Sequence, residues 1–450
     1  MLLDNSISQI NNLLKSKEIS NQDLIDETYQ NIEKSGKVVN DFITVVEKAK
    51  PGLPYVLKDS YSTLGIKTTC ASNVLNNYVP QYDATVYTKL NNAGMSLVGK
   101  MNMDAWGHGA SSENTDFGPV RNPWDLERVA GGSSGGPAAA IAARHCLFAI
   151  GEDTGGSIRN PAAWCNITGL KVSYGRVSRY GCIAYASSFD TVGPMAKTAE
   201  DCAYVLELIA GRDPYDATSA NKPVPKYTEE LKKDVKKLVI SVPKELFGEG
   251  LDNEAKLAIE KAKKEFEKLG IEIREISMPL FHYGLAAYYI IAPSETSSNL
   301  ARYDGIRFGN NRTNFTEETK RRIMIGTYTL SAGYYDAYYK KAQQVRTLFI
   351  KEYEKALTGC DAILMPVNPT PPTKIGELIN DPVQNLLADF YTTSQNPVGV
   401  PSLALPCGFT KSGLPIGMQL VGKMFSEDVL LRIGYHYQQI TDWHKRKPKL

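Results

Sequence analysis

Two segments rich in glycine and serine lie close together in the chain, and their residue types suit acyl-transfer chemistry. One reads Gly-Gly-Ser-Ser-Gly-Gly over residues 131–136, and the other reads Asp-Thr-Gly-Gly-Ser-Ile-Arg over residues 153–159. Glycine lets backbone N–H groups approach a ligand closely, and serine supplies a nucleophile or a proton relay. Upstream, Lys58 ends a short apolar run, where a buried base would be placed. The three segments together predict one acyl-transfer site.

Cleavage of an amide would use these residues in separate roles. An amide is a poor electrophile, so the reaction needs an activated nucleophile, a proton for the leaving nitrogen and donors for the developing oxyanion. We assign Ser157 as nucleophile, Ser133 as proton relay and Lys58 as base. Lys58 must be neutral to act, and burial would favour that form by penalising the ammonium. The oxyanion hole is expected at the consecutive N–H groups of Thr154, Gly155 and Gly156.

Other interpretations of the same residues have less support. Residues 131–135 fit the G-x-S-x-G elbow of an α/β-hydrolase, but that elbow follows a strand, and residues 121–125 are typical of a loop. Its histidine could be only His145, His282, His436 or His444, none of which lies in a supporting motif. A phosphate-binding loop would need a lysine in register after the glycines, which is absent. For Lys58, the alternative is a surface lysine that ends a strand.

Composition limits the function classes. The chain has 450 residues, with 51 Lys and Arg against 49 Asp and Glu, so its net charge is +2, which does not indicate a nucleic-acid or membrane surface. The seven cysteines include no C-x-x-C pair, which argues against a zinc site and a disulfide framework and favours a reducing compartment. No apolar signal core or stretch of ~20 apolar residues is present. We therefore expect a soluble, cytoplasmic protein.

Local patterns predict the elements that must position these residues. Residues 5–35 indicate two amphipathic helices, the second opened by a capping box of Ser20 and Asp23. Strands are expected at 53–58, 96–100 and 147–150, with a helix around 83–93 and an alanine-rich helix whose first residue is Pro137. Residues 237–277 predict a βαβ unit with Asp252 or Asn253 as helix cap and Gly270 as stop. Residues 212–232 are polar and are expected to connect two lobes.

This combination resembles the amidase signature family, whose catalytic group is Ser–cis-Ser–Lys. Within it, the chain is similar to the glutamine-hydrolysing subunits of tRNA-dependent amidotransferases. The motifs that carry this resemblance lie at 99–104, 111–114, 122–125, 169–179, 187–190, 321–324, 333–339, 401–406 and 413–417. The resemblance implies a single α/β unit over residues 1–450, with a large mixed central sheet flanked by helices on both faces. We expect N-terminal helices to about residue 50, a signature core at about 51–205 and a second lobe at about 233–450.

The resemblance also implies a reaction and partners. The subunit would hydrolyse glutamine and release ammonia, and a partner would use it to convert Glu-tRNA(Gln) to Gln-tRNA(Gln). ATP and magnesium would be used by that partner, with no cofactor or metal in this chain. The assembly would be a heterotrimer with subunits B and C that contacts tRNA mainly through the partner and involves no membrane. The same resemblance places glutamine binding at Tyr288, Arg322 and Asp389.

Several alternatives stay open at this stage. Tyr288 could be a core aromatic, and Arg322 and Asp389 could cap helices. The chain could also be a free-standing amidase for small aliphatic or aryl amides, or a scaffold subunit without catalysis. Three residues depart from the family pattern beside the two loops, namely Ala130, Pro137 and Glu152, where proline, serine and a small residue are usual.

Overall fold

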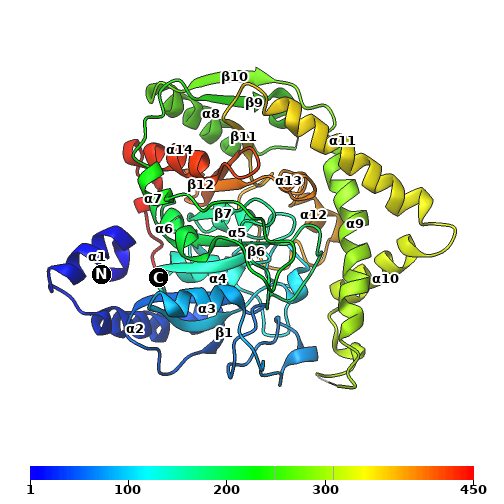
Figure 1. Ribbon diagram of the computed structural model, residues 1–450, viewed down its shortest axis with the longest axis horizontal. Coiled ribbons are helices and arrows are strands. Elements are labelled where there is room, and N and C mark those ends of the chain that lie inside the picture. The colour runs from blue at the N-terminus through cyan, green and yellow to red at the C-terminus, as the bar shows by residue number, and fades with distance from the viewer. Residues whose placement is uncertain (249, 308) are drawn as a thin grey trace.

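Eleven strands form one mixed sheet among the residues that the computed structural model describes, which are 1–248, 250–307 and 309–450 (Figure 1). The strands, in the order in which they lie across the sheet, are β1 (Phe42–Val45), β3 (Met95–Met101), β2 (Leu53–Lys58), β6 (Phe148–Asp153), β8 (Thr191–Ala196), β7 (Thr168–Lys171), β12 (Ser402–Phe409), β13 (Pro415–Val421), β11 (Ala362–Pro366), β9 (Val239–Pro243) and β10 (Glu272–Ile276). β2 runs parallel to β3 and β6, whereas β8 runs antiparallel to β6. The predicted mixed α/β fold is confirmed.

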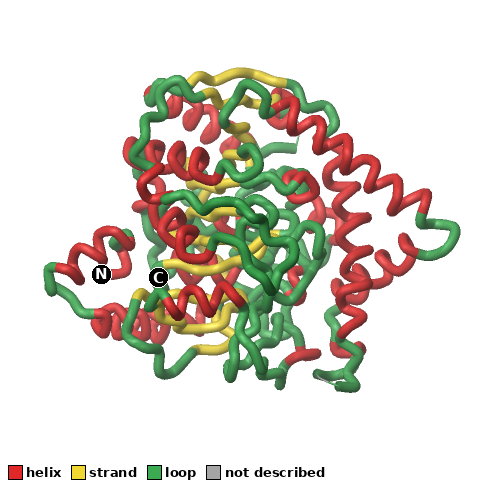
Figure 2. Tube along the Cα trace, in the orientation of Figure 1, coloured by secondary structure: helices red, strands yellow, loops and turns green. Residues whose placement is uncertain are grey.

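Helices cover both faces of the sheet because successive strand residues alternate between the faces. In β2, Tyr55 and Leu57 join the core formed with α3 (Thr85–Asn92), α6 (Ala199–Ile209), α8 (Asn253–Lys268) and α14 (Glu427–Ile440). Val56 joins the opposite core, which contains α4 (Gly135–Ala142) and α5 (Arg159–Trp164). Figure 2 shows the strands as an inner layer between helices. The alternation assigns Lys58, two residues after Val56, to the face of α4 and α5.

The N-terminal helices and the βαβ unit form as their local signals predict. α1 (Ile7–Lys15) precedes α2 (Asn21–Val39), and Ser20 and Asp23 make the expected capping box. β9 and β10 are parallel neighbours joined through α8. Asp252, rather than Asn253, is the cap, and its carboxylate accepts from the N–H groups of Glu254 and Ala255.

A group of longer helices lies on the side of the molecule away from α1 (Figures 1 and 2). It consists of α9 (Gly284–Asn299), α10 (Glu317–Leu330) and α11 (Lys341–Ala356), and both α10 and α11 pack against α9. The remaining helices are α7 (Tyr227–Glu230), α12 (Pro382–Leu387) and α13 (Gln395–Val398). Short helical turns span Leu2–Asp4, Asn73–Leu75, Ala105–Gly107, Lys244–Phe247, Phe281–Tyr283, Leu300–Arg302, Arg312–Asn314, Asp336–Lys340 and Trp443–Lys445. No helix in the described part of the chain has the length and apolar content to cross a bilayer.

Two local predictions are wrong. Residues 121–125 lie in a hairpin of β4 (Arg121–Asn122) and β5 (Asp125–Val129), joined by a turn at 123–124, and not in an irregular loop. The Asn122 side chain closes this hairpin, because its Nδ2 donates to the carbonyl oxygen of Val129. The helix after the first glycine loop begins at Gly135, so Pro137 is its third residue rather than its first. The pair β4–β5 lies outside the main sheet and is therefore not the strand of a hydrolase elbow.

Candidate active site

Lys58 and Ser133 meet in the interior, between the end of β2 and the start of α4. Lys58 Nζ donates to Ser133 Oγ over 2.7 Å, and both side chains are fully buried. The surface-lysine alternative is therefore wrong. The peptide bond between Gly132 and Ser133 is cis. Gly132 leaves no room for a side chain, since an added Cβ would lie 2.0 Å from Asp104 Oδ2.

Ser157 lies on the loop between β6 and α5, and the two glycine-serine loops are joined directly. The Ser134 N–H donates to the Ser157 carbonyl oxygen over 3.1 Å. Ser157 is 7% exposed, whereas Ser133 and Lys58 are 0% exposed. A nucleophile must be reached by substrate and a relay need not be, so this order fits the roles expected for the two serines.

A buried ion pair shapes the second loop. Asp153 accepts from the N–H groups of Gly156 and Ile158 at 2.9 and 3.0 Å, and Arg159 binds both of its carboxylate oxygens. Burial alone would raise the pKa of Asp153, but the Arg159 guanidinium outweighs burial and holds that pKa well below its usual range. Arg159 also donates to Gln395 and Asn396, so it ties the loop to the segment that follows α12. Its position at the end of the second motif did not by itself indicate this role.

The backbone donors expected at the oxyanion hole are not equivalent. The Gly156 N–H is already engaged by Asp153. The N–H groups of Thr154, Gly155 and Ser157 donate to none of the described residues. These three amides are therefore free to bind an oxyanion, and the Ser157 N–H was not in the expected set.

Glu152 contacts the candidate base directly. Its Oε2 lies 2.7 Å from Lys58 Nζ, and its carbonyl oxygen accepts from the same nitrogen at 3.2 Å. Its other carboxylate oxygen accepts from the Thr154 hydroxyl, which also contacts Asp190. The sequence marked Glu152 only as a departure from the family pattern.

The three residues expected to bind glutamine lie in one neighbourhood formed by α9, α10 and the segment after α12. Arg322 Nη1 donates to the Tyr185 hydroxyl at 2.5 Å, and its Nε contacts Glu318 at 2.6 Å. The Tyr289 hydroxyl donates to Asp389 Oδ2 at 2.8 Å. Burial raises the pKa of Asp389 to about 7, against the opposing effects of the Tyr289 hydrogen bond and the Arg322 charge. Tyr185, Tyr289 and Glu318 were not expected here, since no local motif marks them.

This neighbourhood touches the second loop. A Cβ added to Gly155 would lie 2.5 Å from the Tyr288 hydroxyl oxygen, and the Thr392 hydroxyl donates to the Gly155 carbonyl oxygen at 2.6 Å. Arg322 lies within α10, and the Asp389 carboxylate binds a tyrosine, so neither side chain caps a helix. Tyr288 is part of an apolar cluster, as the core interpretation expects, and its role in substrate binding stays a prediction.

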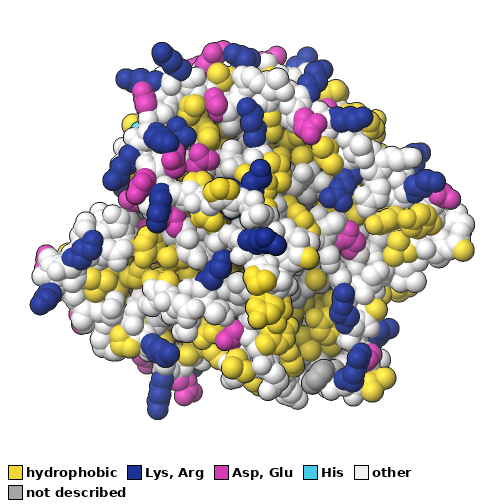
Figure 3. Space-filling model, viewed as in Figure 1, with side chains coloured by type: hydrophobic (Ala, Val, Ile, Leu, Met, Phe, Trp, Pro, Cys, Tyr) yellow, Lys and Arg dark blue, Asp and Glu magenta, His cyan; other side chains and the backbone are white. Residues whose placement is uncertain are grey.

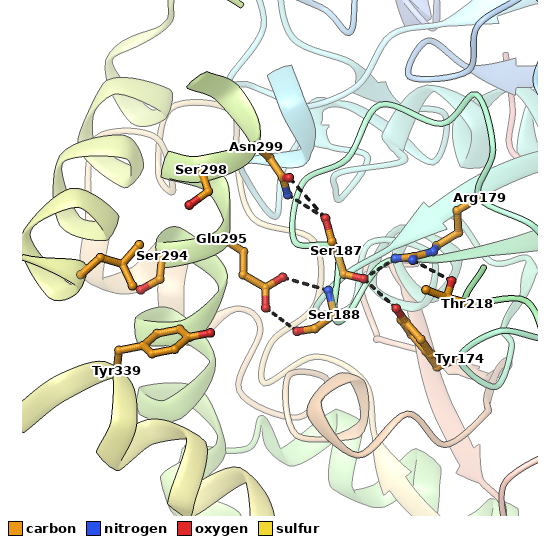
Figure 4. Close-up of a pocket in the computed structure, with 11 residues that line it drawn as sticks. Tyr174, Arg179, Ser187, Ser188, Thr218, Ser294, Glu295, Ser298, Asn299 and Tyr339 are labelled. Carbon is orange, nitrogen blue, oxygen red and sulfur yellow. Dashed lines mark hydrogen bonds between the residues drawn. The ribbon is translucent and has the colours of Figure 1, made fainter. Parts of the chain in front are cut away.

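Some of the site residues and their neighbours line cavities. One of about 540 Å³ is lined by Ser111, Glu318, Arg321 and Asn385, among others. One of about 210 Å³ is lined by Glu152, Cys182 and Asp190, among others. Figure 4 shows a third, of about 420 Å³, which shares Arg179 and Ser187 with the second. Among the described residues, no three His, Cys, Asp or Glu side chains are grouped to hold a metal ion.

Comparisons with known proteins show the family to which the chain is similar. The family model described as Amidase matches residues 24–431. The chain is 49% identical over 484 aligned residues to a protein of Geobacillus kaustophilus named as the A subunit of glutamyl-tRNA(Gln) amidotransferase, covering 100% of both. The crystal structure of the A subunit of glutamyl-tRNA(Gln) amidotransferase from Thermotoga maritima superposes with a TM-score of 0.87 at 40% identity, covering 98% of this chain and 96% of that one.

A more distant structure shares the fold. The 6-aminohexanoate cyclic dimer hydrolase complexed with substrate gives a TM-score of 0.90 at 24% identity and covers 99% of both chains. The match to the family model covers both glycine-serine loops, Lys58 and the neighbourhood of Arg322 and Asp389. The chain therefore belongs to the amidase family.

Proposed function

We propose that the chain hydrolyses glutamine to glutamate and ammonia, as the glutaminase subunit of a tRNA-dependent amidotransferase. The full-length similarity to proteins named as the A subunit of glutamyl-tRNA(Gln) amidotransferase supports the class. The observation that carries the choice of substrate is the placement of Arg322 and Asp389, two opposite charges in one buried neighbourhood against the Gly155 loop.

Free glutamine is a zwitterion, so its pocket needs a cation for the α-carboxylate and an anion for the α-ammonium. Arg322 suits the carboxylate because its guanidinium is always charged and has a nitrogen free to donate. Its Nε and Nη1 already contact Glu318 and Tyr185, whereas its Nη2 makes no hydrogen bond with the described residues. Asp389 suits the ammonium. Tyr288, with its hydroxyl against Gly155, would lie between these charges and the reacting amide.

The chemistry follows from the proton path. As Ser157 Oγ attacks the carboxamide carbon, its proton passes to Ser133 Oγ, and the Ser133 proton passes to the neutral amine of Lys58 over the 2.7 Å contact. The free amides of the second loop bind the oxyanion. The proton then returns along the same path to the leaving nitrogen, which departs as ammonia. Water repeats the sequence on the acyl-enzyme, releases glutamate and restores Ser157.

The remaining steps belong to partners in this proposal. Subunits B and C of a heterotrimer would take up the ammonia, and one of them would use ATP and magnesium to convert Glu-tRNA(Gln) to Gln-tRNA(Gln). The net charge of +2 supports placing most tRNA contacts outside this chain. Figure 3 shows lysine and arginine scattered among acidic side chains on the face in view. All seven cysteines are unpaired, which fits a reducing, cytoplasmic setting.

The buried contact between Lys58 and Ser133 argues against a scaffold without catalysis. The choice of substrate distinguishes a free-standing amidase for small amides from a glutaminase. We propose to measure ammonia release from glutamine and from propionamide by the purified chain, with Ser157→Ala as the inactive control.

The expected result is weak hydrolysis of glutamine that rises when subunits B and C are added, with little hydrolysis of propionamide. Faster turnover of propionamide than of glutamine would contradict the proposal. So would ATP hydrolysis or tight tRNA binding by the chain alone.

A further inference from the structure

Glu152 is a buried carboxylate at the centre of the candidate site, and the proton path above does not use it. It is 3% exposed, and its Oε2 lies 2.7 Å from Lys58 Nζ. The same nitrogen donates to Ser133 Oγ at 2.7 Å. Lys58 is therefore held between its relay serine and a carboxylate. An adjacent negative charge favours the ammonium form of a lysine, which is the form that cannot act as a base.

A second carboxyl group is coupled to the first through one hydroxyl. The Thr154 Oγ1 lies 2.5 Å from Glu152 Oε1 and 2.7 Å from Asp190 Oδ1. A hydroxyl has one proton and can donate to one of these oxygens at a time. The other contact is satisfied when that carboxyl carries a proton of its own. The geometry therefore suits one proton shared by the two acids.

The pKa of Asp190 indicates which of the two acids carries the shared proton. Burial, reinforced by the Glu152 charge, raises the pKa of Asp190 to about 8, so near neutral pH Asp190 is mostly protonated. Glu152 and Lys58 then form a buried ion pair, and protonated Asp190 adds no charge to it.

Other titratable groups around Glu152 are neutral or paired near neutral pH, except Asp104, which is mostly ionised and is kept in every variant below. Burial raises the pKa of Tyr61, Cys70 and Cys182, so all three are neutral. Arg179 acts on Asp190 from the side of the 210 Å³ cavity, and it is paired with Asp216. Asp104, beyond Ser133, acts on Lys58, and burial raises its pKa to about 6.

We propose that Glu152 is a positioning residue that holds Lys58 against Ser133 and sets the pH at which Lys58 becomes a base. This inference rests on the proposed function, in which Lys58 is the base. Loss of one proton from the Lys58 ammonium to solvent leaves an amine beside the Glu152 carboxylate. The amine then takes the Ser133 proton. The cavity lined by Glu152 and Asp190 gives the two acids a route for proton exchange.

The test is the pH dependence of glutamine hydrolysis by the full chain and its Glu152→Gln variant. The side chain introduced by Glu152→Gln has the shape of the glutamate side chain and keeps an oxygen acceptor for Lys58, but it carries no charge. The ammonium then loses its stabilising partner, so activity should persist to lower pH. We expect the acid limb of kcat, measured at saturating glutamine, to move down by about one pH unit or more, with little change in KM at any one pH.

A matched control and a second variant guard against a merely structural effect. Glu295→Gln removes a carboxylate from the neighbouring cavity, where it binds Ser188 and does not contact Lys58 (Figure 4). Its acid limb should stay in place. If Glu152→Gln does not fold, Glu152→Ser removes the same charge with the small type of side chain common at this position, and the same downward shift is expected.

Two further measurements separate this inference from the proposed function. Ser157→Ala should be inactive, and its activity with glutamine would remove the proposed nucleophile whatever Glu152 does. The acid limb is also read from the rate at which phenylmethylsulfonyl fluoride modifies Ser157, which requires no glutamine. An unshifted limb in a folded Glu152 variant, with Ser157→Ala inactive, would overturn the role of Glu152 alone.

Discussion

Lowering the pH through 7 should weaken glutamine binding by neutralising Asp389. This carboxyl is 7% exposed, and burial raises its pKa to about 7 although the Tyr289 hydroxyl and the Arg322 charge oppose the shift. A carboxyl with a raised pKa is neutral below that pKa and charged above it. The substrate ammonium needs the charged form. Binding should therefore be strong above pH 7 and be lost progressively below it.

The magnitude follows from the ionised fraction of Asp389. With a pKa of about 7, roughly nine tenths of Asp389 is ionised at pH 8, about half at pH 7 and about one tenth at pH 6. An apparent dissociation constant rises in inverse proportion to the competent fraction. The KM for glutamine should therefore rise about tenfold between pH 8 and pH 6.

The assay measures initial rates of ammonia release over a range of glutamine concentrations at several pH values. Asp389→Asn should give a high KM that no longer changes with pH, because its side chain has no charge to lose. Glutaramic acid, which is glutamine without the α-amino group, is the matched substrate and should show no such rise in the unaltered protein. A KM for glutamine that is flat from pH 6 to pH 8 in the unaltered protein would refute the assignment of Asp389 to the ammonium.

Three further changes test the pocket and the loop. Arg322→Ala should cost about 2–5 kcal/mol in kcat/KM for glutamine and leave propionamide hydrolysis nearly unchanged; equal losses with both substrates would indicate structural damage. Asp153→Asn leaves the buried Arg159 charge uncompensated and should lower the free energy of unfolding by about 3–5 kcal/mol in urea titration; an unchanged midpoint would contradict this. Gly155→Ala places a Cβ 2.5 Å from the Tyr288 hydroxyl oxygen, so the buried Tyr288 ring must move and kcat/KM for glutamine should fall; full activity would refute the close approach.

Features set by short-range patterns were predicted from the sequence. The strand that ends at Lys58, the Ser20 capping box and the βαβ unit each depend on residues near one another in the chain. The family resemblance indicated the mixed sheet, which is confirmed, and brought Lys58 and Ser133 into one site. Their side chains are in contact in the structure.

Features that depend on distant residues were not predicted. Arg159 binds Gln395 and Asn396, more than two hundred positions away, and no local pattern marks such a partner. Tyr185 contacts Arg322 across a gap of 137 positions. The sequence marked Glu152 as unusual, yet its contact with Lys58 required the pairing of β2 with β6 to be known.

The central claim is that Ser157 attacks the substrate and Ser133 relays its proton. The most direct test incubates the chain with 6-diazo-5-oxo-L-norleucine, a reactive glutamine analogue, quenches the reaction and locates the adduct by peptide mass spectrometry. The account predicts modification of Ser157, its absence in Ser157→Ala and slower modification in Lys58→Ala. An adduct on Ser133 in place of Ser157 would contradict the account by reversing the roles of the two serines.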